Sequence, residues 1–258
     1  YSDPGRDSRL GRLVAASVEL PDWLRRRAER LIARLGELKL SKYNIGRGDA
    51  PARPPLPDLP EGNRILVAGQ VEDDASVLLG CGAVRTNLEL LAECRGQNPD
   101  AVIIYKPHPD VDASLRAGRI DPGEALKHAD MVASDADPID LIAAVAQVWT
   151  MTSLLGFEAL IRGTPVTCLG MPFYAGWGLT RDHGDVVARR LARPSLAGLV
   201  HASLIEYPRY IDPLSGRACP VETVVDRLAS GTIAPPGRLV VALAGVQKLW
   251  AGLRGQRF

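Results

Sequence analysis

Residues 106–110 read KPHPD, directly after an apolar run, and they combine a cation with a histidine on a stiff backbone. Each proline fixes its own φ at about −65° and pushes the preceding residue towards extended conformations, so His108 is restrained twice. Lys106 cannot ligate a metal and would repel one. The pair suits an anion, with charge from Lys106 and a hydrogen bond or a proton from His108 near neutral pH. His108 is either a structural corner or a positioned acid.

A second polar cluster, GQVEDDAS, occupies residues 69–76 after the apolar run ILVA. Gln70 can donate or accept a hydrogen bond, and Asp73 and Asp74 supply carboxylates. Ser76 can cap the segment that follows. An acidic turn of this kind is either a solvated loop or part of a site, and its position after the first strand of a sheet leaves both interpretations open.

A third cluster lies within TMTSLLGFEALIRGTPV, residues 150–166. Thr152 and Ser153 stand where a helix is expected to begin, and helix starts bind phosphate through free N–H groups and the positive end of the dipole. A Ser or Thr that only caps its own helix needs no ligand, so both interpretations remain. Gly156 allows a close approach, and Glu158 could accept hydrogen bonds from ribose hydroxyls.

The fourth cluster, GMPFYAGWGLTRDH at residues 170–183, follows the run PVTCL and sets Phe173, Tyr174 and Trp177 among glycines. Such aromatic side chains either plug the core or offer a face on which a sugar or base can stack, and the sequence favours neither. The four clusters together describe phosphate, ribose and acid chemistry. This combination is typical of a nucleotide-sugar site.

The elements that must position these clusters alternate along the chain. Strands are predicted by the apolar runs at 65–68, 101–105, 131–133, 147–151 and 165–169, and helices between them at 87–95, 139–146 and 153–162. Near-continuous apolar strands that alternate with helices indicate an α/β fold, a Rossmann-like parallel sheet with helices on both faces. Such sheets bind ligands outside the carboxyl ends of their strands.

Three regions are predicted. Residues 1–60 carry an amphipathic helix with a basic outer face, from about 21 to 40, and a proline-rich linker that begins at 46 and runs on to 62. Residues 61–190 contain the sheet and the four clusters. Residues 191–258 contain helix candidates at 195–206, 220–230 and 238–254, of which the last is a packing helix or a membrane-surface contact.

The composition argues against several classes of protein. With 31 Lys and Arg against 30 Asp and Glu, the net charge of +1 is not that of a protein that coats nucleic acid. The sequence contains neither the GxxxxGK[ST] motif of a P-loop nucleotidase nor an early GxGxxG fingerprint. Asp135 and Asp137 imitate an acidic metal motif but stand in a polar loop without a partner, so we treat the match as chance and expect no metal site. The four scattered cysteines are expected to be reduced thiols of a cytoplasmic protein.

Five strings resemble one protein family: VAGQVEDDAS, YKPHPDV, TSLLGFEALIRGTPVTCLG, PFYAGWGLTRD, and YPRYIDPLSG with Cys219 and Pro220. They are similar, in this order and from about Tyr1 to Arg227, to bacterial capsule polysaccharide biosynthesis proteins that act as β-Kdo transferases. The resemblance implies a GT-B glycosyltransferase that moves Kdo from CMP-Kdo to a lipid-linked glycan, with this chain as its carboxyl-side, donor-binding half.

The resemblance also implies roles by position. His108 would face the CMP phosphate and support its departure, Thr152 and Ser153 would bind that phosphate, and Glu158 would bind the ribose. The family is thought to retain the anomeric configuration, which needs either a covalent glycosyl intermediate or a same-face route, and Asp74 is our hypothesis for the nucleophile of the first. The expected catalytic residues are therefore Asp74 and His108. The expected donor-binding residues are Gln70, Lys106, His108, Thr152, Ser153, Gly156 and Glu158.

The sequence departs from the family at one point. Members carry a Glu-Asp-Gly segment in the amino-side domain, whereas this chain contains none and its residues 1–10 resemble the close of that domain. The chain is therefore expected to be an incomplete module. The alternatives are a donor-binding or capsule assembly and export component without catalysis of its own, and a GT-B enzyme that uses another nucleotide sugar. The expected partners are CMP-Kdo, a lipid-linked acceptor, capsule export proteins and the inner face of the inner membrane, with no nucleic acid and no cofactor.

Overall fold

The fold is that of a computed structural model, which describes residues 2–40, 56–184 and 187–232. These residues fall into two compact units, one made of residues 2–39 and 56–208 and the other containing residues 209–232. The helix candidate at 238–254 and the first part of the proline-rich linker lie outside the described residues. The predicted division at residues 60 and 190 stays a prediction.

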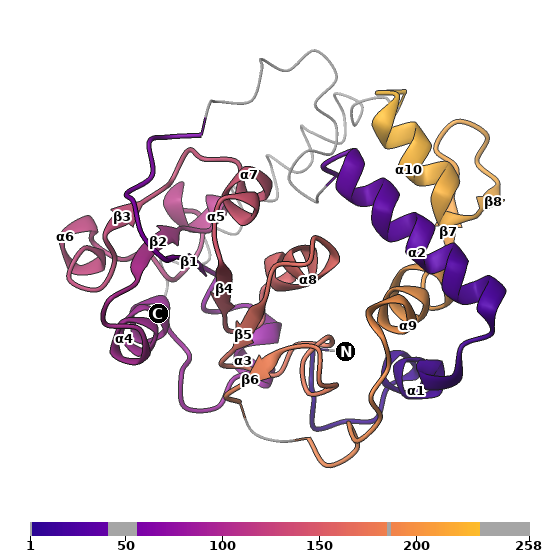
Figure 1. The fold of residues 1–258 in the computed structure, drawn as a ribbon, viewed down its shortest axis with the longest axis horizontal. Helices are drawn as coiled ribbons and strands as arrows, with labels where there is room; N and C mark the ends of the chain where they lie inside the picture. The colour runs from indigo at the N-terminus through magenta and orange to yellow at the C-terminus, as the bar shows by residue number, and fades with distance from the viewer. Residues whose placement is uncertain (1, 41–55, 185–186, 233–258) are drawn as a thin grey trace, which may run out of the picture. The chain divides into compact units, whose positions relative to one another are not determined.

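Within the described part of the larger unit, six strands form one parallel sheet (Figure 1). In sequence they are β1 (Arg64–Ala68), β2 (Val102–Lys106), β3 (Met131–Val132), β4 (Gln147–Thr150), β5 (Val166–Cys168) and β6 (Arg181–Asp182). Their order in the sheet is β3-β2-β1-β4-β5-β6, so successive strands are added on one side of β1 up to β3 and on the other side from β4 onwards. The five predicted strands are confirmed, and β6 was not predicted.

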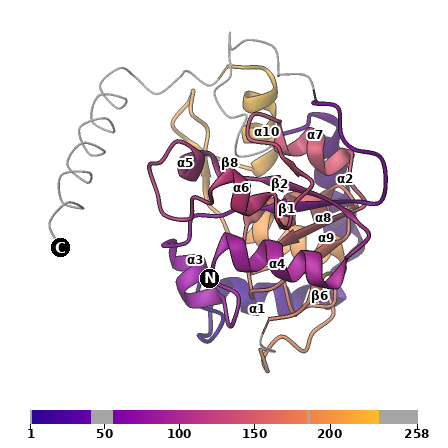
Figure 2. The ribbon, with the colours of Figure 1, turned by 90° about the vertical axis from the view of Figure 1, so that its left-hand side faces the viewer.

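Helices cover both faces of the sheet, as the sequence predicts (Figure 1). The helices that follow the strands are α3 (Ala75–Gly80), α4 (Asn87–Gln97), α5 (Pro109–Asp112), α6 (Pro122–Ala125), α7 (Pro138–Ala143) and α8 (Leu154–Ile161). α4 and α6 lie on one face, which Figure 2 shows with α4 in front of the strands, and α7 and α8 lie on the other. The helix predicted at 139–146 ends at Ala143, because the N–H of Ala146 already donates to Arg64 of the sheet at 2.9 Å.

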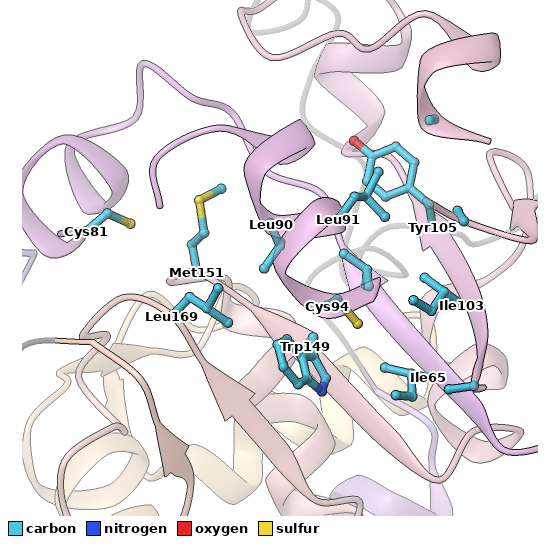
Figure 3. Close-up of a cluster of buried hydrophobic side chains, with 14 of the residues drawn as sticks. Ile65, Cys81, Leu90, Leu91, Cys94, Ile103, Tyr105, Trp149, Met151 and Leu169 are labelled. Carbon is cyan, nitrogen blue, oxygen red and sulfur yellow. The ribbon is translucent and has the colours of Figure 1, made fainter. Parts of the chain in front are cut away.

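A core cluster of buried hydrophobic side chains lies between α4 and the strands (Figure 3). Leu90 and Cys94 of α4 are fully buried against Ile65 of β1 and Trp149 of β4. A buried aliphatic side chain contributes about 1.5–3 kcal/mol, so this layer supplies much of the stability of the sheet. A capping box at Thr86 fixes where α4 begins, because its hydroxyl accepts from the N–H of the third helical residue and that residue's carboxylate accepts in return.

The helices that flank the sheet pack together in the same unit. They are α1 (Arg9–Ala16), the short 3-10 helix η1 (Ser17–Glu19), α2 (Asp22–Glu37), α9 (Leu196–Val200) and the π-helical segment η2 (His201–Glu206). α2 contacts α9, η2 and α8, which confirms the predicted amphipathic helix near 21–40. The helical segment predicted at 195–206 is confirmed, with α9 as its first half and the π-helical η2 as its second.

The smaller unit contains the antiparallel pair β7 (Tyr210–Ile211) and β8 (Ala218–Cys219), followed by α10 (Val221–Ala229), which confirms the helix predicted at 220–230. The Arg227 guanidinium, with the N–H of Leu214 and the hydroxyl of Ser215, lowers the pKa of Asp212 to about 2. No helix in the described parts of either unit is long and apolar enough to cross a bilayer.

His201 is a buried titratable side chain at the first position of η2. Its Nδ1 has no hydrogen-bond partner among the residues that the structure describes. Burial lowers its pKa, Arg27 lowers it further, and Glu206 opposes this shift. A histidine held neutral in the folded chain takes up a proton more readily once the chain unfolds, so acid should favour unfolding.

We therefore expect the wild-type chain to lose free energy of unfolding, relative to His201→Leu, as the pH falls from about 7 to about 5. The contribution of a neutral His201 to the free energy of unfolding is fully present above the ordinary pKa of histidine, which applies in the unfolded chain. It is lost as the pH falls towards the lowered pKa of the folded chain. The slope cannot exceed about 1.4 kcal/mol per pH unit for one group. Urea unfolding across this range tests the prediction, and parallel stability curves for the two proteins would contradict it.

Candidate functional site

The carboxyl ends of three neighbouring strands bring most of the predicted site residues to one edge of the sheet. The register pairs Ala68 of β1 with Lys106 of β2, and Gln70 and His108 follow shortly after these positions. β4 adjoins β1 on its other side and leads to Thr152. Because the strand order reverses between β1 and β4, this edge is the point at which open α/β sheets bind ligands.

Gln70 bridges the ends of β1 and β4. Its Oε1 accepts from the N–H of Thr152 at 2.8 Å and from the hydroxyl of Thr150 at 3.1 Å, while its Nε2 donates to the Thr152 hydroxyl at 2.9 Å. The Asn87 side chain holds the Gln70 backbone from the other side, with both bonds at 2.8 Å. The side chain of Gln70 is thus engaged by the protein, and its predicted contact with a donor stays a prediction.

Four of the predicted residues form one chain of hydrogen bonds. It runs from Gln70 to the hydroxyl of Thr152, which donates to Ser76 Oγ at 3.2 Å, and Ser76 Oγ donates to Asp74 Oδ1 at 2.7 Å. Asp74 also caps α3, since the same oxygen accepts from the N–H of Ser76 at 2.8 Å. The first and third clusters of the sequence therefore meet, and they present an exposed carboxylate at the edge of the sheet.

Ser153 is the N-cap of α8 and is tied to the same edge. Its Oγ accepts from the N–H of Leu155 at 3.2 Å, and its own N–H donates to the Thr150 hydroxyl at 3.1 Å. A hydroxyl that accepts in a cap still carries a proton that it can donate. The Thr152 hydroxyl directs its proton to Ser76, so Ser153 is the better placed of the two to donate to a phosphate.

His108 is the N-cap of α5, so the structural corner is confirmed. Its backbone is extended, with φ −70° and ψ 135°, and its Nδ1 accepts from the N–H of Asp110 at 3.2 Å. Because Nδ1 accepts, the proton of the neutral imidazole is on Nε2, which can donate a hydrogen bond. The predicted role of His108 as an acid stays a prediction.

Lys106 reaches away from the strand end towards the loop before α7. It is buried, and its ammonium donates to the carbonyl of Ser134. Burial lowers its pKa, while Asp112, Asp135 and Asp137 oppose the shift. The interpretation of Asp135 and Asp137 as a pair without a partner is therefore wrong, and Asp137 also caps α7. Among the described residues, including Asp135 and Asp137, no group of three or more His, Cys, Asp or Glu side chains could hold a metal ion.

The aromatic cluster packs into the core. Tyr174 is 0% exposed and its hydroxyl donates to the carbonyl of Ser153. Trp177 is buried as well, and its indole N–H donates to the carbonyl of Phe173 at 2.8 Å. A Cβ at Gly156 would overlap the Tyr174 hydroxyl, so the close approach that Gly156 permits is made by Tyr174. For Tyr174 and Trp177 the structure favours the core plug over the stacking face.

Glu158 lies in the middle of α8 and is 7% exposed. It follows Ser153 at the distance of more than one helical turn, on the helix whose first residues border the edge described above. Burial of a carboxylate to this degree is uncommon in proteins and is usually accompanied by a specific interaction. Its predicted hydrogen bonds to ribose stay a prediction.

Three further residues hold the edge together and were not singled out from the sequence: Thr150, Asn87 and Arg116. Asn87 is fully buried and joins Gln70 to the carbonyl of Gly118, which it reaches at 2.9 Å. Arg116 forms an ion pair with Asp73 at 2.9 Å and lies near Asp74, and these carboxylates raise its pKa. Arg116 could have been singled out from the sequence, because it is a cation in the glycine-containing segment that follows KPHPD. Nothing in the sequence indicates that Asn87 reaches back to Gln70.

A cleft of about 450 Å³ adjoins this edge. Its lining includes Gly5, Leu79, Gly80, Cys81, Met171 and Arg189. The cleft reaches the hydrogen-bonded residues through Gly80, whose added Cβ would lie 3.2 Å from the Thr152 methyl group. The thiol of Cys81 is buried in this wall, and burial raises its pKa to about 11, so it is not a nucleophile at neutral pH.

Comparison with known proteins identifies the family. Residues 17–210 match the family described as capsule polysaccharide biosynthesis protein, which covers well over half of the chain. The chain belongs to this family. The sequence resemblance to capsule polysaccharide biosynthesis proteins is thereby confirmed.

The relatives of this capsule polysaccharide biosynthesis protein include two curated proteins that are longer. The capsule polysaccharide modification protein LipA of Neisseria meningitidis serogroup B is 47% identical over 194 residues, or 75% of this chain and 27% of LipA. The lipopolysaccharide-processing protein LpsZ of Rhizobium meliloti is 41% identical over 230 residues, or 89% of this chain and 51% of LpsZ. The chain thus spans 27% of one curated relative and 51% of the other.

Two solved structures of KpsC from Thermosulfurimonas dismutans are similar to this capsule polysaccharide biosynthesis protein. The beta Kdo 2,7 transferase has a TM-score of 0.73 at 39% identity, and covers 89% of this chain and 69% of its own. The beta Kdo 2,4 transferase has a TM-score of 0.77 at 35% identity, with 89% and 70% covered. The parallel sheet with helices on both faces therefore matches the GT-B-like fold of these proteins, as the resemblance implied.

The packing of Gly156 in this family member gives a prediction with an unusual sign. Gly→Ala inside a helix normally stabilises by up to about 1 kcal/mol, but Gly156→Ala should destabilise by about 1–3 kcal/mol because the methyl group meets Tyr174. Gly36→Ala in α2, where nothing lies within 4 Å of the added Cβ, should show the normal gain. Urea unfolding compares the two variants. A stabilised Gly156→Ala, or an equal loss in a Tyr174→Phe background, would contradict this packing.

Proposed function

We propose that this chain forms the donor-binding module of a glycosyltransferase and that its donor is CMP-Kdo. The observation that carries the proposal is the placement of two N-cap residues, His108 after β2 and Ser153 after β4, on either side of β1 in the sheet. Each uses an acceptor atom for its own helix and has a proton to donate. The similarity to the two KpsC Kdo transferases supports the same donor.

The leaving group in this proposal is a phosphate of CMP, whose negative charge grows as the bond to the sugar breaks. Ser153 donates a hydrogen bond to this phosphate, and the neutral His108 imidazole donates another from Nε2. Glu158 lies further along α8, where its carboxylate accepts hydrogen bonds from the ribose hydroxyls. In this proposal, hydrogen-bond donors of the chain stabilise the negative charge that develops on the CMP phosphate, and no metal ion takes part.

Retention of configuration can proceed through a covalent glycosyl intermediate or by a same-face route, and we propose the first. In the proposal an Asp74 oxygen attacks the anomeric carbon while CMP departs with the bonding electron pair. A hydroxyl of the acceptor then displaces Asp74 and releases its proton to solvent. The Asp74 carboxylate is exposed, and Oδ1 is held by the backbone and hydroxyl of Ser76. We propose a lipid-linked glycan as the acceptor and the inner face of the inner membrane as the place of reaction.

A second candidate function is donor binding without catalysis by this chain alone. It is favoured by the sequence, which contains no Glu-Asp-Gly segment of the kind found in the family. The two candidates share the donor site and differ only in transfer. Binding and transfer are therefore measured separately below.

Titration with CMP tests the donor site. The wild-type chain should bind CMP, and His108→Ala should lower the affinity by about tenfold or more, because one charge-assisted hydrogen bond is lost. Calorimetry with CMP, and with UDP as the competitor, measures this effect. Better binding of UDP than of CMP would point to another nucleotide sugar, and no binding of CMP to the wild-type chain would refute the donor site.

Uncapping of α5 is a separate consequence of His108→Ala and has a matched control. Asp121 caps α6, a helix of the same four-residue length that also begins with proline. Asp121→Ala should therefore cost a similar cap without lowering the affinity for CMP. An equal loss of affinity in both variants would assign the effect to helix capping.

Asp74→Asn separates charge from capping at the proposed nucleophile. The Asn oxygen can still accept from Ser76 and cap α3, but it cannot form a glycosyl ester, so CMP affinity should persist while Kdo transfer falls on the order of a thousandfold or more. Mass spectrometry of the acceptor after incubation with CMP-Kdo measures transfer. Transfer at the full rate by Asp74→Asn would refute the role of Asp74, and CMP binding without transfer by the wild-type chain would favour the second candidate.

A further inference from the structure

We infer that Gln70 is a positioning residue, which sets the spacing between the Asp74 carboxylate and the Ser153 phosphate contact through two hydrogen-bonded branches. The inference rests on the proposed function, because it assigns Gln70 to positioning instead of donor contact. One branch starts at the amide nitrogen of Gln70 and ends on Asp74. The other starts at its amide oxygen and ends on Ser153.

The orientation of the Gln70 amide is fixed by a backbone group. The N–H of Thr152 can only donate, so the atom that it reaches at 2.8 Å must be the amide oxygen. The amide nitrogen therefore faces the Thr152 hydroxyl, at 2.9 Å. Since an amide nitrogen only donates, the Thr152 hydroxyl must accept from it and send its own proton elsewhere.

The first branch has one direction along its whole length. The Thr152 hydroxyl donates to Ser76 Oγ at 3.2 Å, and Ser76 Oγ donates to Asp74 Oδ1 at 2.7 Å. A carboxylate only accepts, so the branch has a pure donor at one end and a pure acceptor at the other. The hydrogen bonds in such a chain polarise one another. Their direction cannot reverse without the loss of the bond at Gln70 or the bond at Asp74.

The methyl group of Thr152 is held between two glycines, which fixes where its hydroxyl points. An added Cβ would lie 2.7 Å from this methyl group at Gly170 and 3.2 Å from it at Gly80. The N–H of Met171 donates to the carbonyl of Gly80 at 2.7 Å, so the two walls are joined. The rotamer of Thr152 is therefore set by packing, and its hydroxyl remains on the side of Gln70 and Ser76.

The second branch ties the phosphate contact to the same amide. The Thr150 hydroxyl donates to the amide oxygen of Gln70 at 3.1 Å and accepts from the N–H of Ser153 at 3.1 Å. Thr150 is fully buried, so this contact is shielded from water. A single amide thus fixes the backbone of Ser153 on one branch and the carboxylate of Asp74 on the other. A donor that spans them would meet both at a set separation, which is a requirement for efficient transfer.

Gln70→Glu is the sharpest test, because the carboxylate keeps the acceptor for Thr150 and Thr152 but loses the donor at neutral pH. The first branch should break while the second persists. We expect Kdo transfer to fall by about tenfold or more with CMP affinity changed less than about threefold. An equal loss of transfer and CMP affinity would overturn the inference and return Gln70 to the donor-binding residues.

A double-mutant cycle in urea unfolding tests the branch without any activity. Gln70 and Ser76 are linked through Thr152, so the shift in unfolding midpoint caused by Gln70→Glu should shrink by about half or more in a Ser76→Ala background. This coupling should vanish in Thr152→Val and return in Thr152→Ser, which restores the hydroxyl. Additive shifts in all backgrounds would overturn the inference.

Two controls keep the outcome decisive. Thr180→Val removes a hydroxyl that donates to the Asp182 carboxylate at 2.6 Å, outside the branch, and its effect should add to that of Gln70→Glu. If Gln70→Glu does not fold, the transfer rates of Thr152→Val and Thr152→Ser carry the test, and equal rates would overturn the inference. Coupling without any Kdo transfer by the wild-type chain would favour donor binding without catalysis, coupling without CMP binding would refute the proposed function, and the hydrogen-bonded branch would stand in both cases.

Discussion

The site depends on one constraint, the separation of β1 and β4 where the strand order reverses. The pairing of β1 with β4 ends at Val67 and Trp149, so the backbone groups that follow need hydrogen-bond partners from outside the sheet. The Gln70 amide replaces the missing rung by accepting from the N–H of Thr152 and donating to its hydroxyl. A side chain that completes a sheet in this way also fixes the loops on either side, and those loops contain Asp74 and Ser153.

The rigidity of this edge is derived from the core beneath it. Asn87 is the first residue of α4, and its side chain holds the backbone of Gln70 at two points. α4 cannot shift, because its capping box fixes its start and Leu90 and Leu91 are buried against the strands. The apolar packing of α4 thus sets the position of the polar loop at Gln70, because Asn87 connects the two. Movement of Gln70 would require α4 to move as well.

The sequence was a good guide to the strands and a partial guide to the site. The first five strands were readable because each contains an apolar run, which is largely buried in all of them but the half-buried β3, whereas β6 is Arg181–Asp182 and has no apolar pattern to read. Clusters at strand ends were readable from their order along the chain. Their partners were not, because the contact of Gly156 with Tyr174 and the turn of Lys106 towards Ser134 depend on segments that meet only in the folded chain.

At His108 the structural corner and a hydrogen-bond donor occur in one side chain, because the cap uses only Nδ1. After β1, β2, β3 and β4 the chain enters a helix whose N-cap is Asp74, His108, Asp137 or Ser153. Each cap side chain is held in place because it accepts a hydrogen bond from a backbone N–H of its helix. A side chain that binds a ligand needs a fixed position of this kind. α3, α5 and α7 have six residues or fewer, so their dipoles are small and add little to anion binding. Among the four caps, only His108 and Ser153 have a side-chain N–H or O–H that can donate, which is why the proposed phosphate contacts are assigned to them.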